Sequence, residues 1–176
     1  MIQRFVIGKP FPTESVVLPV EPAAAAVPYL TAEPDGSWSF SLAEDAVVYG
    51  LGEMPRGINK RGWHYVTDNT DESHHGENRL SYYGAHNFLL IDGGAGRSVF
   101  GVFVDFPGKV FYDIGYTRHD RLTFRTEEPD YDLYILTGDS PNAVCTEFRK
   151  LIGHSYIPPK WAFGFAQSRW GYKTED

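Results

Sequence analysis

Cysteine is nearly absent from this sequence: Cys145 is the only one, so no disulfide can form within the chain. Long apolar runs are also missing, since no stretch reaches the roughly 18 residues that a membrane-spanning helix requires. The first five residues lack the features of a secretory signal, which favours a cytoplasmic location. Positive charge is scarce: the formal net charge is −7 and no basic run exceeds Lys60-Arg61. This balance argues against a nucleic-acid partner.

The composition is that of a globular domain. Hydrophobic residues make up 42% of the chain and charged residues 22%, and 176 residues are enough for one domain with a sizeable core. Aromatic residues reach 15%, which suits both strand packing and sugar-binding surfaces.

The first 79 residues predict short strands and a long irregular segment. Residues 5–7 and 16–20 are apolar enough for strands, and residues 37–42 alternate polar and apolar side chains as a half-buried strand does. Four alanines between the prolines of residues 22–28 are too few for a stable helix, which indicates a loop or edge segment. Residues 47–79 are rich in Gly, Asn, Asp, Glu and His, and such a stretch is typical of a functional or disordered segment.

Regular strands follow at short intervals. Residues 87–92 and 98–106 form a predicted hairpin around the glycine-rich residues 93–96. Three further strands are predicted at residues 109–113, 121–125 and 131–136. Strands joined by short turns, without helices between them, indicate a mainly β, antiparallel sandwich or barrel.

One helix is predicted near the carboxyl end. Ser140 is a suitable N-cap, Pro141 fits the first helical position and Gly153 a C-terminal stop. Four apolar residues form a stripe along it: Val144, Phe148, Leu151 and Ile152. Cys145 lies beside this stripe and is expected to be a small packing residue rather than a nucleophile.

The last segment has a different character. Residues 161–166 are almost all apolar, as in a parallel strand that is buried on both faces. This predicts a domain boundary, with a β-domain over residues 1–157 and the beginning of a second unit over residues 158–176. The chain is therefore expected to be incomplete at its carboxyl end. The strand, lacking neighbours, is expected to favour self-association into a homo-oligomer.

Three segments, in this order, resemble glycoside hydrolase family 31. They are YGLGE at residues 49–53, YGAHNFLL at residues 83–90, and PPKWAFGF at residues 158–165 followed by QSRWGY at residues 167–172. The resemblance implies a galactose-mutarotase-like antiparallel β-sandwich, followed by the first strand of a truncated (β/α)8 catalytic barrel. It also implies a parent α-glucosidase whose partners are α-linked glucosides or oligosaccharides, with no cofactor.

Family members hydrolyse α-glycosidic bonds with retention, using two aspartates about 5 Å apart. In the family both lie on later barrel strands, beyond the residues of this sequence, so the chain is expected to be inactive without the missing barrel. Two residues are implied in substrate binding. The carboxylate of Asp68, in a loop, would accept a hydrogen bond from a sugar hydroxyl, with Asp71 and Glu72 as rivals. Trp170, at the end of the first barrel strand, would stack on a pyranose ring.

Other signals are weaker. His74 and His75 are adjacent, and neighbouring residues rarely bind one metal ion, so no metal site is expected. Two alternatives of another class stay open. One is a stand-alone carbohydrate-binding sandwich, and the other an epimerase that uses His64 and Glu53. Within the family, an α-xylosidase is the alternative specificity.

Overall fold

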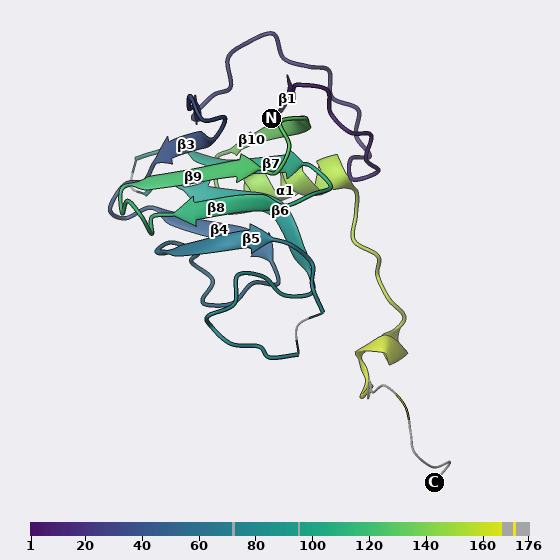
Figure 1. Ribbon diagram of the computed structural model, residues 1–176. Helices are drawn as coiled ribbons and strands as arrows, with labels where there is room; N and C mark the ends of the chain where they lie inside the picture. The colour runs from purple at the N-terminus through teal and green to yellow at the C-terminus, as the bar shows by residue number, and fades with distance from the viewer. Residues whose placement is uncertain (72, 95, 167–170, 172–176) are drawn as a thin grey trace.

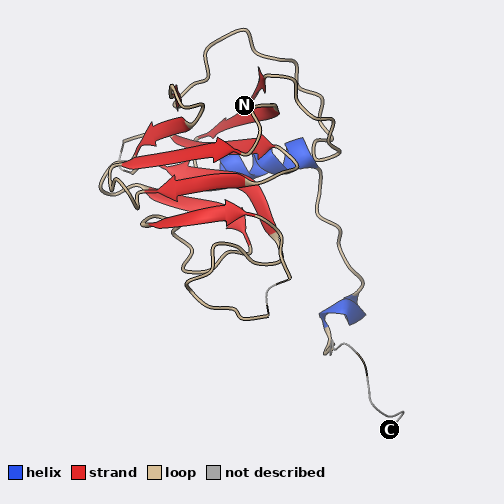
Figure 2. Ribbon diagram, in the orientation of Figure 1, coloured by secondary structure: helices blue, strands red, loops and turns tan. Residues whose placement is uncertain are grey.

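The fold is a two-sheet β-sandwich with a helix on one side (Figures 1 and 2). The computed structural model describes residues 1–71, 73–94, 96–166 and 171. Within these residues ten strands form two antiparallel five-stranded sheets. In spatial order the first sheet contains β1 (Ile2–Ile7), β10 (Tyr131–Gly138), β7 (Val99–Asp105), β6 (Ala85–Asp92) and β4 (Val47–Gly52). The second contains β2 (Thr31–Ala32), β3 (Trp38–Ser41), β9 (Arg121–Thr126), β8 (Val110–Ile114) and β5 (Trp63–Thr67).

Burial differs between the sheets because only the first is covered on both faces. Helix α1 (Pro141–Ile152) packs on β10, β7 and β6, opposite the second sheet. Residues 131–136 of β10 are therefore all buried, whereas β8 and β9 alternate between buried and partly exposed residues. Tyr131, Leu133 and Ile135 enter the core between the sheets, and Tyr134 and Leu136 face the helix. The predicted mainly β sandwich is confirmed.

The predicted helix is confirmed, and so are the residues predicted at its two ends. The Ser140 hydroxyl accepts a hydrogen bond from the Ala143 N–H at 3.2 Å, and Gly153 ends the helix with a φ of 90°. Val144 and Leu151 are buried in the predicted stripe. The packing role expected for Cys145 was wrong, because the residue is exposed. No helix in the described part of the chain is long and apolar enough to cross a membrane.

Two predictions for the first 79 residues were wrong. Residues 16–20 form no strand, because the N–H groups of Val17 and Leu18 donate instead to the Leu151 carbonyl at the end of α1, at 2.9 and 3.2 Å. Residues 47–79 are not irregular throughout, since they contain β4 and β5. The alternation of polar and apolar residues does not predict these two strands, because glycines interrupt β4 and polar residues flank β5.

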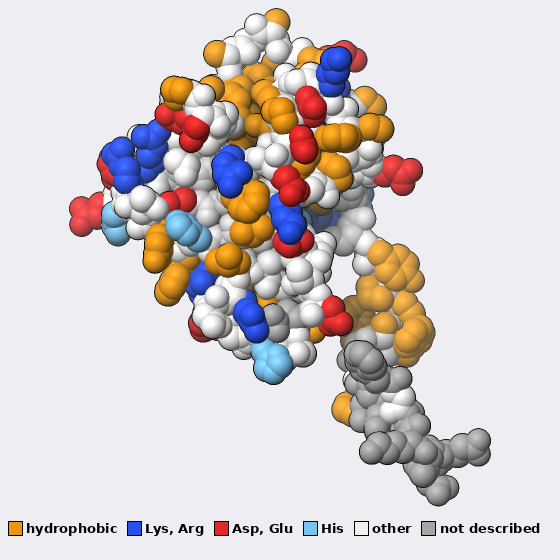
Figure 3. Space-filling view, viewed as in Figure 1, with side chains coloured by type: hydrophobic (Ala, Val, Ile, Leu, Met, Phe, Trp, Pro, Cys, Tyr) orange, Lys and Arg blue, Asp and Glu red, His pale blue; other side chains and the backbone are white. Residues whose placement is uncertain are grey.

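The apolar segment near the carboxyl end also differs from its prediction. Instead of a buried strand at residues 161–166, the structure has a 3-10 turn over Lys160–Phe163, and Trp161 and Phe165 are 80% and 96% exposed. A strand needs neighbours for its backbone hydrogen bonds, and no strand of the described chain lies beside this segment. The segment extends away from the sandwich, with its apolar side chains uncovered (Figures 1 and 3). The division at residue 157 stays a prediction.

Candidate functional site

The YGLGE motif forms a bulge that brings β4 unusually close to β6. Pairing of the two strands is irregular between Gly50 and Gly52, and φ is +119° at Gly50, +66° at Leu51 and +74° at Gly52. A Cβ atom on Gly52 would lie 2.3 Å from the Gly84 carbonyl oxygen, and one on Gly50 would lie 2.1 Å from that of Phe88. Glycine is therefore required at both positions for steric reasons. The bulge directs Leu51 fully into the core and joins the end of β4 to the residue before β6.

A long loop of residues 68–84 connects β5 to β6, so it crosses from the second sheet to the first. Its two arms bond to one another: the Thr70 N–H donates to the Tyr82 carbonyl at 3.2 Å, and the Ala85 N–H to Asn69 Oδ1 at 2.6 Å. Farther out, the Tyr82 hydroxyl donates to the Gly76 carbonyl at 3.0 Å. The 68–84 loop is thus a folded projection rather than an open strand connection.

Asp68 begins this loop, directly after β5. Its Oδ2 lies 2.9 Å from the Lys109 ammonium, and its N–H donates to the Ser81 hydroxyl at 3.3 Å. The hydrogen bond to Asp68 raises the pKa of Lys109, so the lysine stays charged. The Asp68 side chain is 35% exposed, which leaves part of the carboxylate accessible. The structure therefore fixes the direction of Asp68 without burying it.

The other predicted substrate-binding residues differ in how they are placed. Asp71 is exposed, farther along the same loop, and has no hydrogen-bond or ion-pair partner among the described residues. Glu72 and Trp170 lie outside the described residues. The structure thus gives a position to two of the carboxylates considered and leaves the role of Trp170 a prediction.

The residues considered for epimerase chemistry have separate partners. His64 Nε2 lies 3.1 Å from Asp113 Oδ2, and its ring packs on Tyr116 with centroids 4.4 Å apart. Glu53, in the bend after β4, donates its N–H to the Gly84 carbonyl at 2.8 Å. The structure therefore engages the His64 side chain and the Glu53 backbone with different residues.

The histidine pair in the 68–84 loop is built into its packing. The His75 ring lies against Tyr82 and Tyr83, with centroids 5.0 and 5.4 Å away, and His74 Nδ1 lies 3.0 Å from the Ser73 hydroxyl. In the part of the chain that the structure describes, no three His, Cys, Asp or Glu residues are grouped to hold a metal ion.

Strand register places Asp68 on the outer face of the second sheet. His64 lies opposite Asp113 in the β5–β8 pair, and Val66 lies opposite Phe111. Side chains alternate along a strand, so Asp68 and its partner Lys109 continue the same outward rows. This face is not predicted from the sequence, because residues 47–79 are expected to be irregular. The signal that could have found it is the enrichment of residues 63–67 in aromatic and β-branched residues, namely Trp63, Tyr65, Val66 and Thr67.

Comparison with known proteins gives consistent matches. The model of the family described as glycosyl hydrolase 31 N-terminal galactose mutarotase-like domain matches residues 23–113, just over half of the chain. The chain is 34% identical over 139 residues to alpha-glucosidase 2 of Bacillus thermoamyloliquefaciens, covering 77% of this chain and 17% of that protein. It is 32% identical over 124 residues to alpha-xylosidase XylQ of Lactiplantibacillus pentosus, covering 70% of this chain and 15% of that protein.

The solved structures include a similar protein. The GH31 dextranase of Flavobacterium johnsoniae, solved with isomaltotriose, superimposes with a TM-score of 0.65 and 25% identity, over 80% of this chain and 17% of that one. The chain spans less than a fifth of the length of each of these three relatives.

Proposed function

Because this chain belongs to the family of glycosyl hydrolase 31 N-terminal galactose mutarotase-like domains, we propose that it is the non-catalytic β-sandwich of a retaining α-glucosidase. The observation that carries this proposal is the family match, which spans β2 to β8 and includes the 68–84 loop. The substrates would be α-linked glucosides or oligosaccharides. The catalytic barrel with its two carboxylates would belong to the rest of a longer protein.

The 68–84 loop would shape the entrance of the active site. Its arms are bonded to one another, so the loop can hold a side chain in a defined direction at little entropic cost on binding. Asp68 suits contact with sugar hydroxyls because a carboxylate accepts several directed hydrogen bonds. Trp170 would add a ring on which a pyranose can stack.

The experiment that tests this function compares the chain alone with the full product of its gene on a chromogenic α-glucoside. We expect hydrolysis only by a product that includes the barrel, with retained stereochemistry, because the resemblance places both catalytic carboxylates on barrel strands. If the full product is inert while this chain still binds sugar, the stand-alone binding module replaces the proposal. An α-xyloside is measured in parallel, because the 32% identity to an alpha-xylosidase makes that specificity the alternative.

Replacing Asp68 with asparagine is expected to raise KM for the α-glucoside about tenfold, because a hydrogen bond to a charged group contributes about 1.5–3 kcal/mol. The measurement is steady-state kinetics of the full product. Asp71→Asn is the matched variant on the same loop. Lys109→Met removes the ion pair but keeps the Asp68 carboxylate. If Asp71→Asn raises KM and Asp68→Asn does not, then Asp71 rather than Asp68 contacts the sugar.

A further inference from the structure

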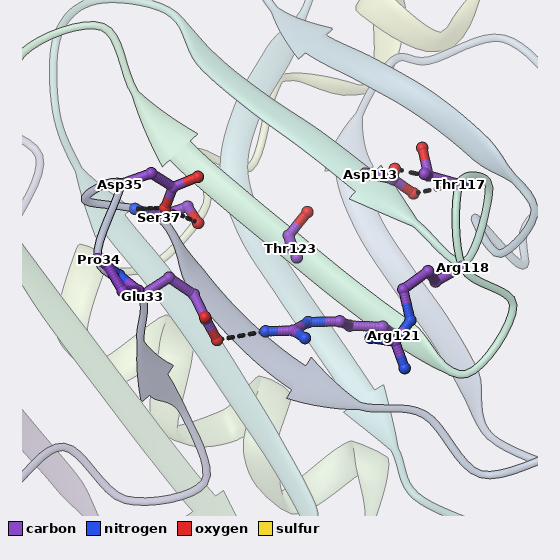
Figure 4. A pocket seen from close by; sticks show the side chains of 9 residues that line it. All are labelled: Glu33, Pro34, Asp35, Ser37, Asp113, Thr117, Arg118, Arg121 and Thr123. Carbon is purple, nitrogen blue, oxygen red and sulfur yellow. Dashed lines mark hydrogen bonds and ion pairs between the residues drawn. The ribbon is translucent and has the colours of Figure 1, made fainter.

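The outer face of the second sheet carries a groove of about 470 Å³. Figure 4 shows Thr123 of β9 in the middle of its floor, with Asp35 and Ser37 on one side and Asp113 and Thr117 on the other. The groove therefore combines side chains from three separate parts of the sequence: the turn before β3, the end of β8 with the turn after it, and β9. None of these residues was singled out in the sequence as a binding residue.

One end of the groove is closed by a fixed polar network. The Arg121 guanidinium donates to Glu33 Oε1 and, at 2.9 Å, to the Ser39 hydroxyl. The Ser39 hydroxyl in turn donates to the same Glu33 oxygen at 2.6 Å. Only one guanidinium nitrogen and one carboxylate oxygen take part in these bonds. Glu33 Oε2 and Arg121 Nη1 have no hydrogen-bond partner among the described residues and can serve a ligand.

The side walls hold two further carboxylates in place. The N–H and hydroxyl of Ser37 both donate to Asp35 Oδ1, at 3.0 and 2.7 Å, and these hydrogen bonds lower the pKa of Asp35. Burial raises the pKa of Asp113, but hydrogen bonds from Thr117 and the Tyr116 N–H outweigh it and leave the pKa below its usual value. Both groups are therefore ionised, oriented acceptors at neutral pH.

The balance of charge disfavours an anionic ligand. The lining contains three carboxylates, of Glu33, Asp35 and Asp113, and two guanidinium groups, of Arg118 and Arg121, for a net charge of about −1 when counted as in free side chains. Arg121 is already paired with Glu33, and Arg118 lies 3.0 Å from Asp120. An anion would meet no unpaired cation in this first hollow, whereas hydroxyl groups can both donate to the carboxylates and accept from the guanidinium groups.

A second hollow of about 430 Å³ extends the groove toward the 68–84 loop. It shares Asp35, Ser37, Asp113 and Thr123 with the first and continues along Phe111 to Leu80. Figure 3 shows the face of β8 and β9 with acidic, basic and apolar side chains intermixed. The two hollows together can hold a ligand longer than one sugar ring, with apolar surface for the ring faces and polar atoms for the hydroxyls.

We propose that this groove is a binding site for a neutral oligosaccharide, formed by Glu33, Asp35, Asp113 and Arg121 on the outer face of the second sheet. The site consists only of residues of this chain. It is separate from the Asp68 carboxylate and stands whether or not the parent protein is an α-glucosidase.

The test is a titration of the isotope-labelled 176-residue chain with maltotriose and with isomaltotriose up to tens of millimolar, followed by amide NMR shifts. We expect saturable shifts at Ser37, Asp113 and Thr123. Asp35→Asn should weaken binding about tenfold through the loss of a charged acceptor, and Thr123→Val, which keeps the shape of the floor, should also weaken it. Glu128→Gln, an exposed residue outside the groove, should leave the affinity unchanged.

Three results would overturn the proposal. One is the absence of shifts in the groove, and another is shifts confined to the 68–84 loop, which would support the proposed function alone. The third, from a parallel titration with inorganic phosphate, is a set of shifts in the groove with phosphate and none with either saccharide. If Asp35→Asn does not fold, as shown by its thermal unfolding, the Thr123→Val titration decides alone.

Discussion

Replacing Gly52 with alanine is expected to lower the free energy of unfolding by about 3 kcal/mol. Two costs combine in this variant. A residue with a Cβ atom is strained at a φ of +74°, and the new methyl group would lie 2.3 Å from the backbone oxygen of Gly84. That oxygen accepts the N–H of Glu53 at 2.8 Å, so it cannot move away without breaking the bond that closes the bulge.

Gly36 provides the matched control for this variant. Its φ of +82° is nearly the same, but nothing lies within 4 Å of an added Cβ atom. Gly36→Ala should therefore show the backbone strain alone, about 1 kcal/mol. The measurement is urea unfolding of the two variants beside the unchanged chain. Equal losses of stability would mean that the close approach of β4 and the residue before β6 is not what requires Gly52.

Replacing Arg61 with alanine is expected to cost about 3 kcal/mol, because one side chain satisfies several backbone carbonyls. Its Nη1 donates to the carbonyls of Ala43, Glu44 and Ala46 at 2.5, 2.9 and 3.3 Å, and its Nη2 donates to that of His119 at 2.8 Å. Arg61 thereby ties the connection before β4 to the turn between β8 and β9. Without it, all four carbonyl groups lose their arginine donor together, and the bonds to Ala43 and Ala46 are partly buried.

Thermal and urea unfolding of Arg61→Ala and Arg61→Lys measure this effect. Lysine keeps the charge but lacks the planar fork, so it should recover only part of the stability. Arg118→Ala is the control, because Arg118 forms only an exposed pair with Asp120 and should matter little. If Arg61→Ala were as stable as Arg118→Ala, these carbonyl groups would have to be satisfied by water instead.

The strands from residue 85 onward were predictable, and those just before were not. Short turns separate β6 to β10, and apolar residues mark each strand, so local sequence was sufficient. β4 was missed because its glycines reflect close contact with β6, which the local sequence does not show. Residues 161–166 predict a strand that the structure does not have, because an apolar run predicts burial without specifying which neighbour provides it.

Of the candidate site, only Asp68 was predictable, because a single aspartate in one loop is sufficient for that prediction. Asp68 was found from the family resemblance, but its Lys109 partner depends on the pairing of β5 with β8. The groove could not be predicted from the sequence for the same reason. Asp35, Asp113 and Arg121 come together only when β3, β9 and β8 lie in their observed order. Pairing of distant strands is decided by the whole sandwich rather than by local periodicity.

The position of β5 has a consequence for how such a domain can diversify. Among the described strands β5 lies at the edge of its sheet and pairs with β8 alone, and the loop that leaves it folds on its own arms. Its tip can therefore gain, lose or exchange residues while both hydrophobic layers keep every contact. One scaffold could accept transplanted loops of different length without a new core having to evolve. Loops of different length would contact substrate at different distances from the sandwich.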